Sequence, residues 1–165
     1  GPLIRDPGGE AYPSARELPS LRVGIGHALF GQALPGNRWS RRYHAIGTTE
    51  SITRDAGWLS GSFVLVRRDA FTRIGGFDES YFMYFEDVDL GARLGMAGWR
   101  NVYVPTAEIV HIGGVSTAGV RSEMVREHHR SAYRYLSRRY RGPALAPLRG
   151  ILRAGLALRA WWVTR

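Results

Sequence analysis

Cysteine is absent from the 165 residues of this chain, which excludes a disulfide framework, a cysteine-based metal site and a thiol nucleophile. The sequence also lacks any apolar run near the roughly 18 residues that a membrane-spanning helix needs, and it opens without a charged and then apolar leader. We therefore expect no integral membrane segment. With 44% hydrophobic and 12% aromatic residues, the chain can bury a core, so disorder is not expected for most of it.

Basic residues are unevenly distributed along the chain. All 23 are arginine, and the formal net charge is +9. Residues 1–118 hold twelve arginines and twelve acids, whereas residues 119–165 hold eleven arginines and only Glu123 and Glu127. The whole net charge therefore belongs to the C-terminal segment, which is expected to seek a phosphate, an acidic membrane face or a nucleic acid. A solvated helix face is the alternative interpretation.

The first half of the chain carries short strand signals and a helical turn. Residues 1–4 have the pattern of an interrupted strand that leads into a turn. Residues 58–66 form an apolar run rich in β-formers, typical of a buried strand. Asp69 is expected to cap a single helical turn, which ends at the glycine pair at residues 75–76.

The second half reads as a helix and two short extended pieces. Residues 86–97 have helical spacing, with Leu90, Leu94 and Ala97 on one stripe and Gly98 as the stop. Residues 100–104 alternate as a strand that ends at the proline at position 105, and residues 108–111 make a second extended piece.

The remaining segments are assigned more coarsely. Residues 20–34 are expected to form a short helix or lid, and residues 35–55 a loop. A long helix is predicted from residue 116 or 117 to about residue 140, and a last amphipathic helix over residues 147–163. Helices mixed with short strands indicate an α/β class with a mostly buried sheet.

Three acids, Glu86, Asp87 and Asp89, fall in the first turn of the predicted helix, where the positive end of the helix macrodipole stabilises carboxylates. That placement is common for structural reasons alone. Aromatic residues and a methionine precede the acids directly, however, which puts the acids at the rim of an apolar wall. An apolar wall raises the basicity of a carboxylate, against the helix dipole that lowers it.

The Asp87-Val88-Asp89 triplet looks like a D-x-D metal motif, but positions i and i+2 on a helix point about 200° apart. Two carboxylates so placed cannot both bind one ion. Asp89 is expected to pair with Arg93 at i+4. Asp87 is then free to act as a general base for a hydroxyl nucleophile.

His111 ends the second extended piece and is followed by Gly113 and Gly114, so its ring has room to project into a cleft. A lone histidine is more commonly a satisfied hydrogen-bonding group than a ligand. One histidine does not hold a metal unaided, so further ligands must come from elsewhere.

A series of short motifs follows the order found in a known family. The motifs are Trp58-Leu59-Ser60-Gly61-Ser62, Arg67-Arg68, Gly75-Gly76-Phe77-Asp78-Glu79, Tyr81-Phe82-Met83-Tyr84, Glu86-Asp87-Val88-Asp89-Leu90, Gly98-Trp99, and Val104-Pro105 followed by His111. Together they resemble the C-terminal half of a family-2 glycosyltransferase with the GT-A fold. Within that family the chain is most similar to bacterial, and above all actinobacterial, rhamnosyltransferases that act on polyprenyl-diphosphate-linked N-acetylglucosamine. The resemblance covers nearly all of the chain.

This resemblance implies the acceptor-side portion of a GT-A, Rossmann-like nucleotide-sugar transferase fold, with C-terminal basic helices. The implied reaction is an inverting, single-displacement transfer of a sugar, L-rhamnose from dTDP-L-rhamnose, to lipid-linked N-acetylglucosamine. Asp87 takes the place of the base that deprotonates the acceptor hydroxyl. Gly61 and Ser62 match the strand end that lines the donor sugar, where a missing side chain allows close approach. The acceptor side is expected to include Glu86, Trp58 and Tyr84.

The resemblance also implies a divalent cation, Mg²⁺ or Mn²⁺, with His111 as one ligand. Most ligands are expected in an N-terminal nucleotide-binding half that this chain lacks. Residues 1–118 are then the acceptor-side half of a catalytic domain, and residues 119–165 an arginine-rich helical extension. We expect the chain alone to be an inactive fragment, with a noncatalytic half or one half of a split enzyme as alternatives.

A lipid-linked acceptor suggests a partner for the basic extension. Arginine-rich helices followed by apolar residues suit an anionic membrane interface; those residues are Leu152, Leu156, Leu158, Trp161 and Trp162. We expect a cytoplasmic protein held peripherally at the inner face of the plasma membrane. A basic module that binds nucleic acid is the other class that the charge allows, but no nucleic-acid motif accompanies the arginines, so we expect no such partner.

Overall fold

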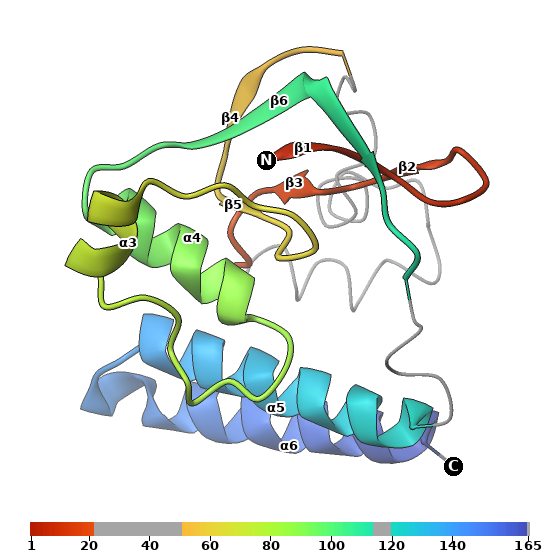
Figure 1. The fold of residues 1–165 in the computed structure, drawn as a ribbon. Helices are drawn as coiled ribbons and strands as arrows, with labels where there is room; N and C mark the ends of the chain where they lie inside the picture. The colour runs from red at the N-terminus through yellow and green to blue at the C-terminus, as the bar shows by residue number, and fades with distance from the viewer. Residues whose placement is uncertain (22–50, 114–119, 165) are drawn as a thin grey trace. The chain divides into compact units, whose positions relative to one another are not determined.

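The computed structural model describes residues 1–21, 51–113 and 120–164. Most of the expected lid at residues 20–34, most of the expected loop at residues 35–55 and the expected start of the long helix lie outside these ranges. The chain forms two compact units, Gly1–Phe77 with Asp87–Gly113, and Asp78–Glu86 with Gly114–Arg165. We call them the first and the second unit. Figure 1 follows the helices and strands of each.

The first unit is built on a mixed sheet with strand order β2-β1-β6-β4. Strand β1 runs parallel to β6, whereas β2 and β4 are antiparallel to their neighbours. The strands are β1 (Pro2–Arg5), β2 (Ala11–Tyr12), β4 (Arg54–Ala56) and β6 (Asn101–Val110). Leu3 and Ile4 of β1 are buried. This mixed sheet with helices confirms the α/β class, and the turn expected after β1 is present.

Strand β6 is longer than the sequence predicts. The proline at position 105 was expected to end the strand, but β6 continues through it to Val110. The register against β1 shifts there, because Pro2 lies opposite Val104 whereas Leu3 lies opposite Glu108. The proline therefore lies in the irregular stretch, where its missing N–H costs no ladder hydrogen bond.

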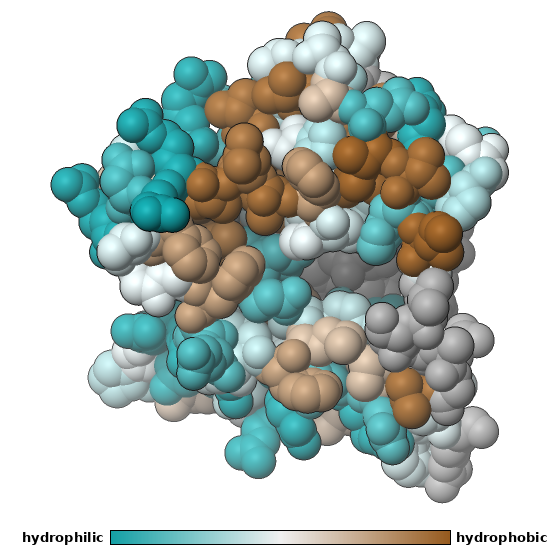
Figure 2. All heavy atoms as spheres, in the orientation of Figure 1, coloured by the Kyte–Doolittle hydropathy of each residue, from teal (hydrophilic) through white to brown (hydrophobic). Residues whose placement is uncertain are grey.

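The apolar run at residues 58–66 is not the buried strand that its composition predicts. Only β5 (Trp58–Leu59) is extended in a sheet, paired with β3 (Ala15–Arg16). The hydroxyl of Ser60 accepts a hydrogen bond from the amide of Ser62 and so closes a turn in place of a ladder. Phe63 and Leu65 beyond this turn are exposed, and Figure 2 shows apolar side chains gathered over the strands of the first unit.

Two helices of the first unit, α3 (Arg68–Arg73) and α4 (Glu86–Met96), lie close to the predicted ranges. Asp69 does not cap α3 as expected, because Arg67 occupies the N-cap and Asp69 pairs with it from the first turn. The glycines after α3 and α4 have positive φ angles, as stops require. A core cluster joins the two helices, with Ala70, Leu90 and Leu94 buried and Val66, Phe71, Ile74 and Trp99 packed around them. Ala97 is exposed, because α4 ends one residue earlier.

The backbone of helix α4 at Gly91 packs directly against the start of β5. A Cβ atom on Gly91 would lie 2.6 Å from the Cβ of Trp58 and 3.0 Å from the carbonyl oxygen of Gly57, so only glycine fits. The buried side chain of Asn101 on β6 fixes this contact, since its amide nitrogen donates to the carbonyls of Gly57 at 3.0 Å and Gly91 at 2.9 Å. Three elements therefore meet around one glycine.

The second unit contains α5 (Arg121–Arg139), the short 3-10 helix η2 (Pro143–Leu145) and α6 (Ala146–Val163), and α5 packs against α6. Ala132, Ser131 and Tyr135 are the buried residues of α5. One face of α6 is turned inward, with Leu148, Leu152 and Leu156 half-buried and Ala160 buried. Among the residues described, no helix is long and apolar enough to cross a bilayer.

The exposed face of α6 differs in part from the predicted one. Leu152 and Leu156 were expected at an interface, but they lie on the inward face, where they are half-buried. The other three expected residues, Leu158, Trp161 and Trp162, are exposed, and so are Ile151 and Val163.

Replacing Gly91 with alanine is expected to lower the free energy of unfolding by about 1–3 kcal/mol, because the added methyl overpacks a backbone contact. Gly95→Ala is the matched control on the same helix, since nothing lies within 4 Å of its Cβ position. That control should raise the free energy of unfolding by roughly 0.5–1 kcal/mol through helix propensity. Urea unfolding followed by circular dichroism measures both. Equal effects of the two substitutions would contradict the close contact.

Candidate active site

The carboxylate of Asp87 is held at the start of α4 by backbone amides. Its Oδ2 atom accepts a hydrogen bond from the amide of Gly61 at 2.9 Å, and its Oδ1 atom accepts one from the amide of Val88 at 2.8 Å. The side chain is half-buried. Each carboxylate oxygen can accept more than one hydrogen bond. The carboxylate therefore keeps lone pairs that can accept a hydrogen bond, and then the proton, from a substrate hydroxyl.

The position of Asp87 follows from the packing of α4. Asp87 lies four residues before Gly91, so both belong to one face of the helix. Gly91 brings this face against β5, and the turn that follows β5 carries Gly61. The structure therefore joins two residues that are 26 positions apart in the sequence.

Burial raises the pKa of Asp87 above the ordinary value of 3.8. The amides of Gly61 and Val88 and the positive charge of Arg16 act in the opposite direction. Desolvation is the larger effect, so the carboxylate is a stronger base than an exposed aspartate.

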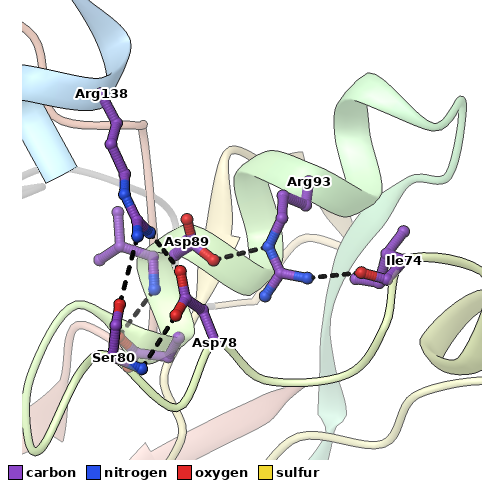
Figure 3. Close-up of polar contacts among 8 residues, drawn as sticks. Ile74, Asp78, Ser80, Asp89, Arg93 and Arg138 are labelled. Carbon is purple, nitrogen blue, oxygen red and sulfur yellow. Dashed lines mark hydrogen bonds and ion pairs between the residues drawn. The ribbon is translucent and has the colours of Figure 1, made fainter.

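Asp89, the other acid of the D-x-D triplet, has a separate structural partner. Its Oδ2 atom accepts a hydrogen bond from Nε of Arg93 at 2.6 Å, and Nη1 of Arg93 donates to the carbonyl of Ile74 at 2.8 Å (Figure 3). The predicted pairing at i+4 is confirmed. Asp87 and Asp89 are therefore directed to different partners and do not form a joint ion site.

The turn that carries Gly61 and Ser62 is exposed. The hydroxyls of Ser60 and Ser62 lie 3.1 Å apart and hydrogen-bond to each other. A Cβ atom at Gly61 would lie 3.6 Å from Oδ2 of Asp87, in ordinary contact with the carboxylate. The missing side chain therefore leaves the space beside the carboxylate open.

Trp58 and Arg16 form a second part of this region in the first unit. The guanidinium carbon of Arg16 lies 5.5 Å from the ring centre of Trp58 and 5.5 Å from that of Tyr12. The indole nitrogen of Trp58 donates to the carbonyl of Glu17 at 3.1 Å. Sequence reasoning missed Arg16, because a single arginine in a turn-rich segment carries no signal of its proximity to an acid far along the chain.

His111 lies at the end of β6, where its amide donates to the carbonyl of Arg5 at 2.8 Å. Its side chain is half-buried. No group of three or more His, Asp or Glu side chains that could hold a metal occurs in residues 1–21, 51–113 and 120–164. The residues described here therefore do not make up a metal site.

Tyr84 and Glu86, expected on the acceptor side, belong to the segment Asp78–Glu86 of the second unit. Both side chains are half-buried. The backbone has φ angles of 65° at Tyr84 and 67° at Phe85, in the left-handed region that bulky residues rarely adopt. Nothing in the sequence pattern predicts this conformation.

The start of the same segment is tied to α5 by an ion pair. Arg138 donates from Nη1 to Oδ2 of Asp78 and from Nη2 to the hydroxyl of Ser80, and the amide of Ser80 donates to Oδ1 of Asp78 (Figure 3). The guanidinium groups of Arg134 and Arg138 each lie 5.7 Å from the ring centre of buried Tyr81. Two arginines of α5, Arg134 and Arg138, therefore make contacts within the second unit.

Hydrogen bonds from Ser80 and Arg138 lower the pKa of Asp78 strongly. A lowered pKa in the folded state stabilises the fold fully above the unfolded value of about 3.9, and this contribution is lost as the pH falls below it. Arg138→Met should therefore lower stability by a constant amount between about pH 5 and pH 7, and by less at pH 3. Urea unfolding at each pH measures the difference, with Arg139→Met as the exposed control. A difference that does not shrink in acid would rule out the pair as its source.

The chain is similar in sequence to known glycosyltransferases. Residues 36–133 match a family described as glycosyltransferase like family 2. The whole chain is 52% identical to the N-acetylglucosaminyl-diphospho-decaprenol L-rhamnosyltransferase of Mycobacterium tuberculosis H37Rv and covers 53% of that protein. Over 92 residues, which are 54% of this chain and 35% of the relative, it is 45% identical to the rhamnosyltransferase WbbL of Escherichia coli K12.

A shorter match, 39% identical over 56 residues, is to the O-antigen biosynthesis protein RfbC of Myxococcus xanthus; it covers 33% of this chain and 4% of that protein. The chain thus spans about half the length of the mycobacterial relative. No solved structure matches the chain.

Proposed function

The chain belongs to glycosyltransferase family 2, and from this premise we propose that it forms the acceptor side of an inverting rhamnosyltransferase. The donor is dTDP-L-rhamnose, and the acceptor is a polyprenyl-diphosphate-linked N-acetylglucosamine. The names of the two rhamnosyltransferase relatives support rhamnose as the sugar, and that of the mycobacterial relative supports the lipid-linked N-acetylglucosamine acceptor. The observation that carries the proposal is the half-buried carboxylate of Asp87, bound to the amide of Gly61.

In this proposal Asp87 is the general base of a single displacement. The acceptor hydroxyl oxygen forms a bond to the anomeric carbon of the sugar, while the bond from that carbon to the nucleoside diphosphate breaks. The proton of the hydroxyl goes to Asp87, whose raised pKa favours the transfer. The amide of Gly61 holds the carboxylate in place during this step.

The other site residues have supporting roles in the proposal. Gly61 and Ser62 line the donor sugar, where the exposed turn leaves space beside the carboxylate. Trp58 contributes an aromatic surface on the acceptor side, with Arg16 over one ring face. Glu86 and Tyr84, which belong to the second unit, are proposed as further acceptor contacts.

Members of family 2 generally use a divalent cation, which neutralises the leaving diphosphate when bound. We propose His111 as one of its ligands. The described residues supply no complete ligand set, and the chain spans only about half of its mycobacterial relative. The remaining ligands are therefore expected from other residues, and the longer protein is the active form.

Asp87→Asn is expected to lower kcat by roughly 10²–10⁴-fold, the usual contribution of a general base. The side-chain oxygen of asparagine keeps the hydrogen bond from the amide of Gly61 and gives up the one from the amide of Val88, so the KM values should change little. In the unchanged enzyme, the rate should fall in acid as Asp87 becomes protonated, with a midpoint above the ordinary aspartate value of 3.8. Rhamnosyl transfer to lipid-linked acceptor by the full-length protein measures both.

Asp69→Asn, at an exposed position on α3, is the matched control and should leave kcat unchanged. Near-normal turnover by Asp87→Asn would remove Asp87 as the base. An acid limb that persists in Asp87→Asn would assign that titration to another group.

The lipid-linked acceptor requires the enzyme to work at a membrane surface, and we propose that α6 provides the contact at the inner face of the plasma membrane. Its exposed face carries Ile151, Leu158 and Trp162, which are 71%, 62% and 76% exposed. Spacings of seven and four residues put them on one stripe of the helix. Arg153 and Arg159 are exposed on the same helix and favour anionic lipid headgroups.

The double substitution Leu158→Ser and Trp162→Ser should weaken binding to vesicles that contain anionic lipid about tenfold or more, because each side chain contributes about 1.5–3 kcal/mol when fully buried. Met96→Ser, which alters a side chain that is 79% exposed on α4, should have little effect. Vesicle flotation measures binding. Vesicle binding that changes neither with the double substitution nor with the anionic lipid content would contradict this contact.

A further inference from the structure

The segment before α4 has a strained backbone that its own sequence does not favour. Tyr84 and Phe85 are consecutive, and both have positive φ angles. All other positive-φ residues in the described ranges are glycines: Gly9, Gly75, Gly76, Gly98 and Gly142. Left-handed backbone is costly for residues with a side chain and persists only where the surroundings impose it. Glycine would adopt this backbone without strain, so we expect the side chains of Tyr84 and Phe85 to make contacts that offset the cost.

Those contacts come from α5 of the same unit. The ring of His128 meets the rings of Tyr84 and Phe85 edge-on, with centroid distances of 5.3 and 5.4 Å. The ring of buried Tyr135 lies 5.8 Å from that of Phe85. Such aromatic pairs are favourable beyond the apolar area that they bury. The two residues on α5 thus hold both strained positions by their side chains.

A partly buried hydrogen bond fixes the backbone at the start of the strained turn. The hydroxyl of Ser131 donates to the carbonyl of Met83 at 2.9 Å, and Ser131 is only 2% exposed. Met83 is half-buried, and a carbonyl in such a site that loses its donor is destabilised, because water replaces the bond only in part. His128, Ser131 and Tyr135 follow each other at spacings of three and four residues, so they form one row on α5.

We propose that His128, Ser131 and Tyr135 are positioning residues that hold the turn at Met83–Phe85 and thereby orient Glu86, the proposed acceptor contact of the same unit. Glu86 follows the strained pair directly. The arginine-rich α5 then has a positioning role in addition to its place in the C-terminal extension. The catalytic consequence rests on the proposed function, whereas the mechanical one does not.

Hydrogen exchange tests the mechanical part without any substrate. In the full-length protein, Ser131→Ala should raise the exchange rate of backbone amides in residues 83–88 about tenfold or more. Ser137→Ala is the matched control, because the partner of the Ser137 hydroxyl among the described residues is the carbonyl of Arg134 in the same helix. Unchanged exchange in residues 83–88 of Ser131→Ala would overturn the proposal.

Kinetics test the catalytic part on the same variants. Ser131→Ala should lower kcat about tenfold, with the KM for each substrate within about twofold, at a temperature where circular dichroism shows the variant folded. His128→Ala should have the same effect, and His128→Phe should restore most of kcat, because it keeps the ring and removes the nitrogens.

The outcomes separate the two proposals. Faster exchange with an unchanged kcat would overturn the positioning role. In that case His128, Ser131 and Tyr135 would stabilise the turn without affecting catalysis. A kcat that His128→Phe does not restore would contradict a role through ring contact. If the unsubstituted protein transfers no rhamnose, the proposed function fails, while the exchange result still decides whether α5 holds the turn.

Discussion

Helix α4 and strand β5 touch at their backbones, and the geometry of the site depends on this contact. Gly91 permits it, because any larger side chain would collide with Trp58. Asn101 secures it by donating from one buried amide group to the carbonyls of Gly57 and Gly91. One turn earlier on the same helix face, Asp87 then meets the amide of Gly61. A packing constraint with no chemistry of its own thus sets the position of the proposed base.

The electrostatic environment separates two aspartates that stand two positions apart. Asp89 pairs with Arg93 on the same helix, and Arg93 links α4 to the end of α3 by donating to the carbonyl of Ile74. Asp87 is bound by backbone amides, and burial raises its pKa. The two side chains point about 200° apart on the helix. This spacing predicts that Asp89 forms an ion pair while Asp87 stays available as a base.

Periodic features of the fold could be predicted, and features that depend on distant contacts could not. The range of α4, the pairing of Asp89 with Arg93 and the stop at Gly98 follow from local spacing and were confirmed. The strand expected at residues 58–66 was wrong, because Ser60 bonds locally and closes a turn. Gly91, Asn101, Arg16 and the row on α5 were missed, since each acts through residues far along the chain. The roles of Asp87, Glu86, Trp58, Tyr84, Gly61, Ser62 and His111 stay predictions.

The central claim is that the carboxylate of Asp87 accepts a hydrogen bond from the amide of Gly61 and that burial raises the pKa of this carboxylate. The most direct measurement is a pH titration of the Gly61 amide proton by nuclear magnetic resonance, because a donor to a carboxylate responds to the ionisation of that carboxylate. The account predicts a titration with a midpoint above the ordinary aspartate value of 3.8, which disappears in Asp87→Asn. A Gly61 amide that does not titrate, or a midpoint at or below the ordinary value, would contradict it.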